Sequence, residues 1–372
     1  MRWFSTKMSI QLGRAQKTGL IIFAVVALLH SFIANEDYIL AKTSSGIQFF
    51  YEGDADWGVK AIVPYSASSI DRANRLRGPF DSQEVQSLYY RHWLGTDDIG
   101  RDVLAGLIHG TYIALQVGFY SMLISLFISF VLAYLGAYHG DKGIRIETRM
   151  IFPAVLISAL FLFYASYTST WSGIILMAAI IMMWIYLANR KSSIISRTKG
   201  VPFDLAIQRL IDIVDSMPGL FLILILLTLF AEPSIANVIL VIVFLRWPVV
   251  TRHLRAEILK IREEEYILSA KSAGQKDIII YLKHVLPMAF SPIIIVASFG
   301  IAAAILTEST LSFLGIGIPL DEVSWGSLIK RARFNFQAWW MALFPGLAIY
   351  LVVILFNSVG ERVNARMRGL DL

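Results

Sequence analysis

The chain has 372 residues, of which 56% are hydrophobic and only 16% charged, and its mean hydropathy is +0.63. This composition excludes an ordinary soluble fold and is typical of a protein that crosses a membrane several times. The lack of cysteine excludes disulfides, thiolate catalysis and Cys-ligated metals. The net charge is +6, and the basic residues lie mostly between apolar runs, so a role in orienting the chain in the membrane explains them better than nucleic-acid binding.

Eight apolar stretches are predicted to be transmembrane helices, because about 20 apolar residues cross the roughly 30 Å hydrocarbon layer. They are Gly19–Ala34, Tyr112–Tyr138, Met150–Ser166, Ser172–Ala188, Pro218–Phe230, Ile235–Val250, Val285–Leu306 and Trp339–Asn357. The fifth is short, and we expect the amphipathic stretch from Ile211 to extend its cytoplasmic end. The predicted fold is an all-α membrane protein, a polytopic bundle of about eight helices.

Basic residues set the predicted orientation, since short cytoplasmic loops retain Lys and Arg. The N-terminus, the second-to-third and fourth-to-fifth connections, residues 251–283 and the C-terminal tail are all basic, so both termini are expected in the cytoplasm. Lys330, Arg331 and Arg333 disagree; we accept this exception, because reversing the last span would misplace the tail. A cleaved signal peptide over the first span is the alternative, and would leave seven spans.

The expected organisation has three parts. Residues 1–35 are the cytoplasmic N-terminus and first helix, residues 36–111 an extracytoplasmic segment that could fold as a small cap, and residues 112–372 the transmembrane domain. Within the last part we expect an inserted hairpin at 150–188 and a cytoplasmic loop at 251–287.

Enzyme and pump motifs are missing from the sequence. It has no G-x-x-x-x-G-K-[ST] loop for nucleotide phosphates, no H-E-x-x-H zinc pair and no G-x-S-x-G elbow, so no catalytic residues and no ATPase are predicted. Its six His residues show no i, i+4 pairing, so no metal site is predicted. Of two charges inside predicted spans, Arg246 is expected to snorkel to the inner surface, while Glu308 could line a substrate route or make structural hydrogen bonds.

The largest cytoplasmic connection carries the signals of a helix–turn–helix. Helices are expected over Tyr266–Ala273 and Asp277–Lys283, with Gly274 ending the first and Asp277 capping the second. Pro287 is expected at the start of the next span. An ordinary amphipathic loop is the alternative.

Three ordered signatures resemble those of bacterial ABC importer permeases of the dipeptide, oligopeptide and nickel family. The run Glu265–Gly274 with Leu286-Pro287 is similar to the EAA loop, His92–Leu104 to "HPLGTDxxGRDVL", and Glu308–Gly315 with Ser324-Trp325-Gly326 to "EASLSFLG…SWG". The chain departs from the family in two places. It has Leu268-Ser269-Ala270 in place of Glu-Ala-Ala, which could shift the acidic contact to Glu263–Glu265. It also has the hairpin 150–188, an insertion into the usual six spans.

The resemblance implies a type I ABC importer permease core and assigns residues by position. The ATPase-coupling loop would comprise Glu263, Glu264, Glu265, Tyr266, Ser269, Ala270, Ala273, Gly274, Leu286 and Pro287. The family signatures, with a possible place along the pathway, comprise Gly95, Thr96, Asp97, Gly100, Arg101, Asp102, Glu308, Ser312, Gly315 and Trp325.

The same resemblance implies partners: a second permease subunit, two ABC ATPase subunits that use ATP and Mg, and an extracytoplasmic solute-binding protein, all at the bacterial inner membrane. No cofactor is expected on this chain. Peptides are the expected substrates, with nickel or another small solute as the alternative. An ion-coupled secondary transporter is one alternative, but the sequence shows neither two four-span repeats nor the additional buried acids that it would require. A membrane enzyme is another, but no catalytic constellation is evident.

Overall fold

The computed structural model describes residues 12–43, 46–53, 57–138, 145–147, 198–200, 203–230, 232–319 and 322–367. The chain divides into two compact units, Met1–Val131 with Ile213–Leu372, and Leu132–Asp212. The predicted hairpin at 150–188 lies outside the described residues.

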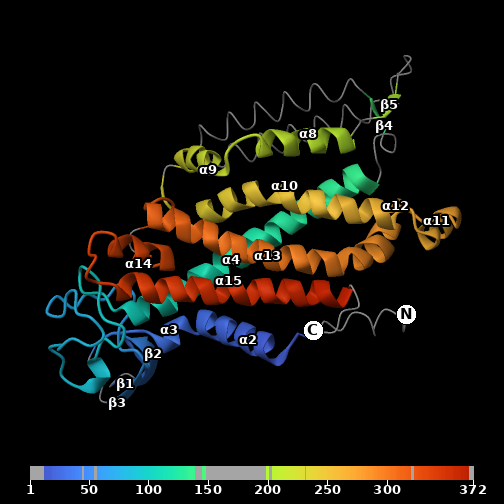
Figure 1. Ribbon diagram of the computed structural model, residues 1–372. Helices are drawn as coiled ribbons and strands as arrows, with labels where there is room; N and C mark the ends of the chain where they lie inside the picture. The colour runs from blue at the N-terminus through green and yellow to red at the C-terminus, as the bar shows by residue number, and fades with distance from the viewer. Residues whose placement is uncertain are drawn as a thin grey trace. The chain divides into compact units, whose positions relative to one another are not determined.

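The first unit is built mainly from helices (Figure 1). They are α2 (Arg14–Leu28), α3 (His30–Ile33), a 3-10 turn at Leu88–Tyr90, α4 (Val103–Ala133), α9 (Gly219–Thr228), α10 (Ile235–Ile261), α11 (Glu265–Ser272), α12 (Asp277–Ile280), a π-helical turn at Tyr281–Val285, α13 (Leu286–Leu314), α14 (Trp325–Ala332) and α15 (Trp340–Met367).

Four helical segments of the described chain are long and apolar enough to cross a membrane. They are Val103–Tyr138, Ile235–Ile261, Pro292–Leu314 and Trp340–Met367. The pair α8 (Phe203–Asp215) and α9 passes the same test only as one bent segment, which would make five. The chain is therefore a helical, multi-pass membrane protein, and the count of eight spans stays a prediction.

The observed helix bounds correct several predicted ones. The second span begins nine residues earlier than expected, at Val103, so residues 103–111 belong to a helix. The sixth continues from Val250 to Ile261. The predicted first span is a 15-residue helix that breaks at Leu29, and the fifth is interrupted before Gly219, where Pro218 is the N-cap of α9. Apolar runs mark the part of a helix that contacts lipid, whereas helices extend beyond it with charged residues.

Local side-chain chemistry explains where these helices start and stop. The Asp102 carboxylate accepts a hydrogen bond from the backbone N–H of Ala105 at 2.7 Å, which caps α4. Ser234 caps α10 through the N–H of Asn237 at 3.1 Å. Helix α13 ends at Gly315, whose φ of +81° is the left-handed conformation that glycine adopts without strain.

Helix α13 lies at the centre of the first unit, packed against α10, α14 and α15. Residues of α13 take part in two apolar clusters. In one, Ala304 and Leu311 pack against α4, α9 and α10; in the other, Ile305 packs against α2, α4, α14 and α15. Gly300 allows this close approach, because a Cβ there would lie 2.4 Å from the sulfur of Met122 on α4.

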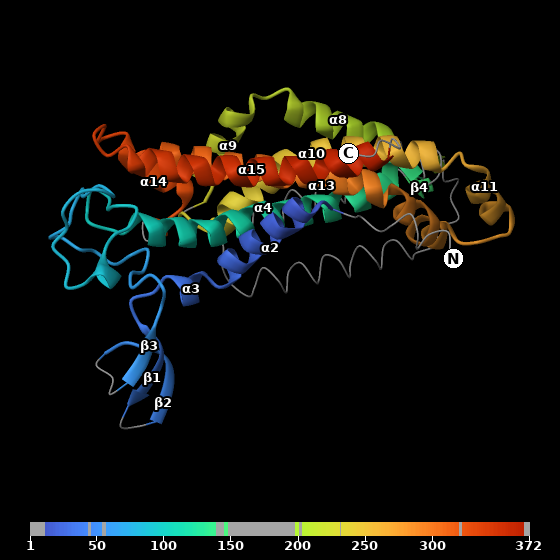
Figure 2. The same ribbon diagram turned by 60° about the horizontal axis from the view of Figure 1, so that its bottom comes forward.

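A small antiparallel sheet follows the first helix. Strand β1 (Tyr38–Thr43) lies between β2 (Gly46–Tyr51) and β3 (Trp57–Lys60), with Leu40 opposite both Phe49 and Val59 (Figure 2). The parallel bridge between Ala34 and Val63 ties the segment to the end of α3. A strand element in this outer segment was not predicted, since its residues alternate too little to distinguish strand from loop.

The second unit contains a π-helical turn (Tyr134–Tyr138), the strand pair β4 (Arg145–Glu147) and β5 (Thr198–Gly200), and most of α8. Gly136 packs against α8, where an added Cβ would lie 2.9 Å from Ile207 Cδ1.

Candidate functional site: a projecting loop, an outer signature network and a membrane cavity

The loop between α10 and α13 forms the predicted helix–turn–helix. Gly274 has a φ of +77°, and the N–H of Gln275 bonds the carbonyl of Ala270 at 3.3 Å, so α11 ends in a glycine turn as expected. Lys271 and Asp277 form an ion pair at 3.8 Å across the turn, with both side chains partly exposed. The turn therefore holds α11 in a fixed direction relative to α12.

Two details of this loop differ from prediction. Asp277 is not the cap of the second helix: the N-cap is Lys276, and Asp277 is the first helical residue. The second helix is also not a separate element, because α12 continues through the π-helical turn at Tyr281–Val285 into α13. Pro287 is the second residue of α13 and donates no backbone hydrogen bond, so the helix lacks one bond directly after the π-helical turn. Helix α12 of the loop and the membrane helix α13 thus form one continuous rod.

The surface of the loop is apolar and acidic at once. Ile267 and Ile280 are buried and anchor it, whereas exposed apolar side chains point away from the bundle: Tyr266, Leu268, Ile278, Ile279 and Leu282. Glu263, Glu264 and Glu265 are exposed beside them. The pKa of Tyr266 is raised above its ordinary value, mainly because the side chain is partly buried. Contiguous exposed apolar residues with a charged rim are typical of a protein interface.

The signature at 92–104 forms a buried polar network at the start of α4. His92 lies between two carboxylates, with Nδ1 2.9 Å from Asp102 Oδ2 and Nε2 3.3 Å from Asp71 Oδ2. Burial alone would lower the pKa of His92, but the hydrogen bonds and charges of Asp102 and Asp71 outweigh it and raise the pKa above its ordinary value. The ring of Tyr65 stacks on His92 at 4.2 Å. The imidazole therefore links the outer segment to the cap of α4.

Two glycines of this signature are required by geometry. Gly95 and Gly100 have φ of +81° and +97°, and a Cβ on Gly100 would lie 2.1 Å from the carbonyl oxygen of Asp71. Thr96 donates its hydroxyl proton to the carbonyl of Asn74 at 2.5 Å, and its own carbonyl accepts the indole N–H of Trp340 at 3.0 Å. These contacts attach the loop to α15.

The charged members of the signature meet the segment before the last span. Arg331 of α14 lies 3.1 Å from carboxylate oxygens of both Asp97 and Asp98. Among the described residues, Nε and Nη1 of the neighbouring Arg101 have no hydrogen-bond partner. The basic cluster that contradicted the predicted orientation is thus partly neutralised by the signature acids.

The second outer signature packs on the first. Glu308 is fully buried in α13 and accepts hydrogen bonds from the hydroxyls of Ser312 at 2.7 Å and Ser309 at 3.2 Å. Trp325 donates its indole N–H to the carbonyl of Leu107 on α4 at 3.0 Å. The sequence left open whether Glu308 lines a substrate route or makes structural hydrogen bonds, and this geometry agrees with structural hydrogen bonds. Ser312 and Gly315 also line a cavity of about 230 Å³ together with Asp98, Lys330 and Arg331.

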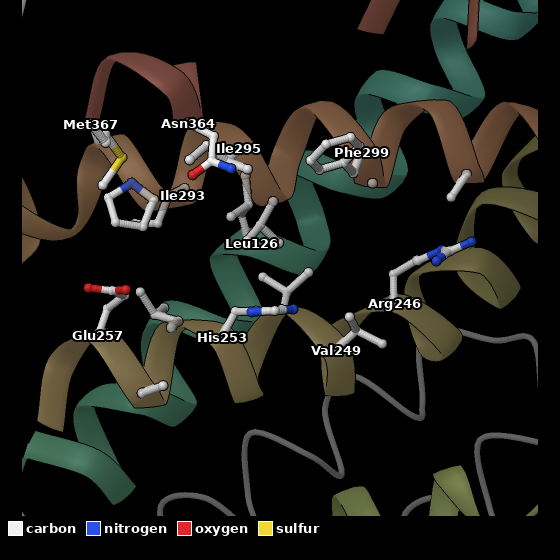
Figure 3. Close-up of a pocket in the computed structure, with 17 residues that line it drawn as sticks. Leu126, Arg246, Val249, His253, Glu257, Ile293, Ile295, Phe299, Asn364 and Met367 are labelled. Carbon is white, nitrogen blue, oxygen red and sulfur yellow. The ribbon is translucent and has the colours of Figure 1, made fainter. Parts of the chain in front are cut away.

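A larger cavity of about 630 Å³ lies among the membrane helices (Figure 3). Its walls are mainly apolar and are formed by Leu126 of α4, eleven apolar residues of α10 and α13 such as Val249 and Phe299, and the end of α15. Its polar side chains are Arg246, His253, Glu257 and Asn364. The sequence placed Arg246 near the inner surface, but α10 continues fifteen residues beyond it, to Ile261, and its Nη2 lies 3.5 Å from the hydroxyl of Thr307 on α13. That Arg246 snorkels to the inner surface stays a prediction.

Among the described residues, no group of three or more His, Cys, Asp or Glu could hold a metal ion.

The sequence matches a known family over residues 191–369, described as the inner membrane component of binding-protein-dependent transport systems. This range contains the projecting loop, Glu308 and Trp325. Residues 191–369, just under half of the chain, therefore form a domain of this ABC importer permease family. Permeases of this kind act in systems with an ATPase and a binding protein, and the family is one of transporters rather than enzymes.

Relatives extend the similarity to most of the chain. A dipeptide transport system permease protein of Alkalihalophilus pseudofirmus is 29% identical over 301 residues, 81% of this permease and 76% of the relative. A glutathione transport system permease protein of Pectobacterium atrosepticum is 26% identical over 302 residues, 81% and 77% of the two chains. A Brucella suis protein named for peptide transport is 36% identical over 160 residues, 43% of this permease and 54% of its own length.

Sequence reasoning missed several residues of the outer network. Asp71, Asn74 and Tyr65 precede the signature by more than ten residues and meet it only through folding. Trp340 gave no signal either, since a Trp at the end of an apolar run is ordinary at a membrane interface.

Proposed function

We propose that this permease forms half of the translocation path of an importer for peptides or peptide-like solutes, paired with a second permease subunit. A solute-binding protein delivers the substrate from outside, and two ABC ATPase subunits supply the energy. The names of the relatives support the peptide class, because dipeptide and glutathione carriers align with four fifths of the chain.

The observation that carries the proposal is the projecting coupling loop. The exposed apolar residues of α11, Tyr266 and Leu268, have 41% and 52% of their surface exposed. Exposure of this apolar surface to water is unfavourable unless a partner covers it. We infer that an ATPase subunit covers them, with Glu263–Glu265 supplying the acidic contact that the family places three to five residues later.

A mechanism follows from the continuity of α12 and α13. ATP binding closes the two ATPase subunits and moves α11 and α12 with them. Because α12 runs into α13 without a loop, the displacement reaches the central helix and, through it, α10, α14 and α15. Rigid-body movement of this rod switches the path between inward-facing and outward-facing states.

The outer signatures are proposed to lie near the docking place of the binding protein, over residues 100–118 and 305–315. Hydrogen exchange in the assembled transporter measures this. Slower exchange in these segments after addition of the binding protein is expected, and unchanged exchange contradicts the docking place.

Co-purification followed by transport tests the whole proposal. The tagged permease should recover an ATPase subunit and a second permease, and the reconstituted complex should take up a tripeptide but not nickel. Leu268→Asp should lower ATPase recovery at least about tenfold, since burying an unpaired carboxylate in an apolar contact is costly. Ile47→Asp is the matched control, because Ile47 is 69% exposed in the outer sheet. Failure of the unmodified chain to recover any ATPase overturns the proposal.

A further inference from the structure

Arg246 is a cation in the middle of a membrane helix. It follows Ile235, the first residue of α10, by eleven residues, or about 16 Å of helix, which is half of a roughly 30 Å hydrocarbon layer. Its side chain points away from Glu257 and toward α13 (Figure 3). Arginine stays charged at any physiological pH, and a charge at this depth costs at least about 2.5 kcal/mol on insertion scales. Such a position needs a compensating ligand.

The described part of the chain supplies little compensation. No Asp or Glu there forms an ion pair with Arg246, and its one hydrogen bond is the long contact of 3.5 Å to Thr307. Glu257 lies eleven residues further along α10, about 16 Å away along the helix axis, which is too far for an ion pair. The carboxylate of Glu308 is already held by Ser309 and Ser312. Most of the five guanidinium donors therefore remain available.

The cavity around this guanidinium suits the end of a peptide. Its volume of about 630 Å³ falls in the range of small-ligand sites, and its apolar walls keep the local dielectric low, which strengthens a pairing of opposite charges. A guanidinium binds a carboxylate through two parallel hydrogen bonds. His253 and Asn364, on the same cavity, can bond peptide amides. A free metal cation would be repelled.

We propose that Arg246 binds the free C-terminal carboxylate of the transported peptide inside the membrane cavity. The inference rests on the proposed peptide function and adds the substrate group that the path selects: an anionic terminus. The bound carboxylate supplies the counter-charge that the described chain lacks, so an occupied path is electrostatically more favourable than an empty one.

Cysteine protection measures binding at this site. The chain has no native cysteine, so Val249→Cys, on the cavity wall, gives a single thiol for maleimide labelling in the assembled transporter. Tri-alanine should slow labelling of this thiol at least about fivefold, whereas tri-alanine amide, which lacks the terminal charge, should not. Adding Arg246→Gln should abolish the protection, and Arg246→Lys should keep part of it. Arg252→Gln is the control, because Arg252 lies on the same helix outside the cavity and pairs with Asp215.

The outcomes separate this inference from the proposed function. Equal protection by the acid and the amide, protection that survives Arg246→Gln, or no protection by tri-alanine while the complex transports it, would each overturn the carboxylate site. Transport of neither peptide by the unmodified complex would instead overturn the peptide function. If Arg246→Gln does not assemble, the Val249→Cys protein that keeps Arg246 still decides the point. Protection of its thiol by tri-alanine but not by tri-alanine amide supports the carboxylate site, and equal protection by both overturns it.

Discussion

At the scale of single residues, the family signature is an assembly of geometric requirements rather than a set of reactive groups. His92 is fully buried between Asp102 and Asp71, and Gly100 adopts a backbone conformation that a side chain would obstruct. Their side chains fix where α4 begins and how the outer segment attaches to it. The residues that look most functional in the sequence are therefore mainly architectural, whereas Arg246, outside every signature, lines the membrane cavity.

His92 should make the outer segment sensitive to pH. Its pKa is raised on folding above the ordinary 6.5, so its contribution to stability is complete below about pH 6.5 and is lost as pH rises through the folded pKa. The thermal midpoint of the purified protein, followed by tryptophan fluorescence, should fall over that window. At low pH, His92→Gln should lower the free energy of unfolding by about 2 kcal/mol, because charged hydrogen bonds are lost, and the thermal midpoint should fall with it. The variant should also lose most of the pH dependence of the midpoint. A slope that persists in this variant contradicts the assignment.

Gly100→Ala should damage the protein severely. The left-handed backbone costs about 1 to 3 kcal/mol for a residue with a side chain, and the contact of 2.1 Å with the Asp71 carbonyl adds to it. Gly346→Ala is the matched control, since a Cβ on Gly346 in α15 meets nothing within 4 Å. Yield of folded protein and thermal midpoint distinguish the two variants; comparable values would show that the loop can rearrange.

At the scale of elements, the rod formed by α12, the π-helical turn and α13 is the feature that connects loop and membrane. The sequence indicated a separate second helix and a cap at Asp277. The structure instead continues the helix, because residues 281–285 contain no glycine or proline to stop it. The π-helical turn precedes Pro287, whose missing N–H removes one backbone hydrogen bond without ending the helix. A continuous helix transmits a push that a flexible loop would absorb.

Gly274→Pro should uncouple ATP hydrolysis from transport without preventing membrane insertion. Proline requires a φ near −65°, whereas Gly274 has +77°, so α11 must change direction. We expect at least about a tenfold loss of peptide uptake per ATP hydrolysed in proteoliposomes. Gly274→Asn should retain most coupling, because asparagine tolerates the left-handed region and space around the position is open. Glu265→Ala should weaken coupling less, since Glu263 and Glu264 remain beside it.

At the scale of the whole molecule, the orientation in the membrane is the remaining prediction. The basic loops predict that the projecting loop and both termini lie in the cytoplasm of a bacterial inner membrane, and that the sheet β1–β3 lies outside. In the first unit, α11 and the sheet lie at opposite ends of the long helices (Figures 1 and 2).

Single cysteines can test this orientation. In sealed right-side-out vesicles, a membrane-impermeant maleimide should label Ile47→Cys at once and Leu268→Cys only after permeabilisation, because the chain has no cysteine of its own. Both positions are exposed, at 69% and 52%. The reverse order of labelling would invert the topology.

The sequence alone determined the class, the family and the coupling loop, because these depend on local signals: apolar length, basic flanks, a glycine that ends α11 and three ordered motifs. The tertiary structure decided what depends on distant residues meeting. It joined Asp71 to His92 across 21 positions and Arg331 to Asp97, ran α12 into α13, and set Arg246 beside Thr307. Hydropathy measures how long an apolar run is; only packing shows where a helix ends and which charge faces a cavity.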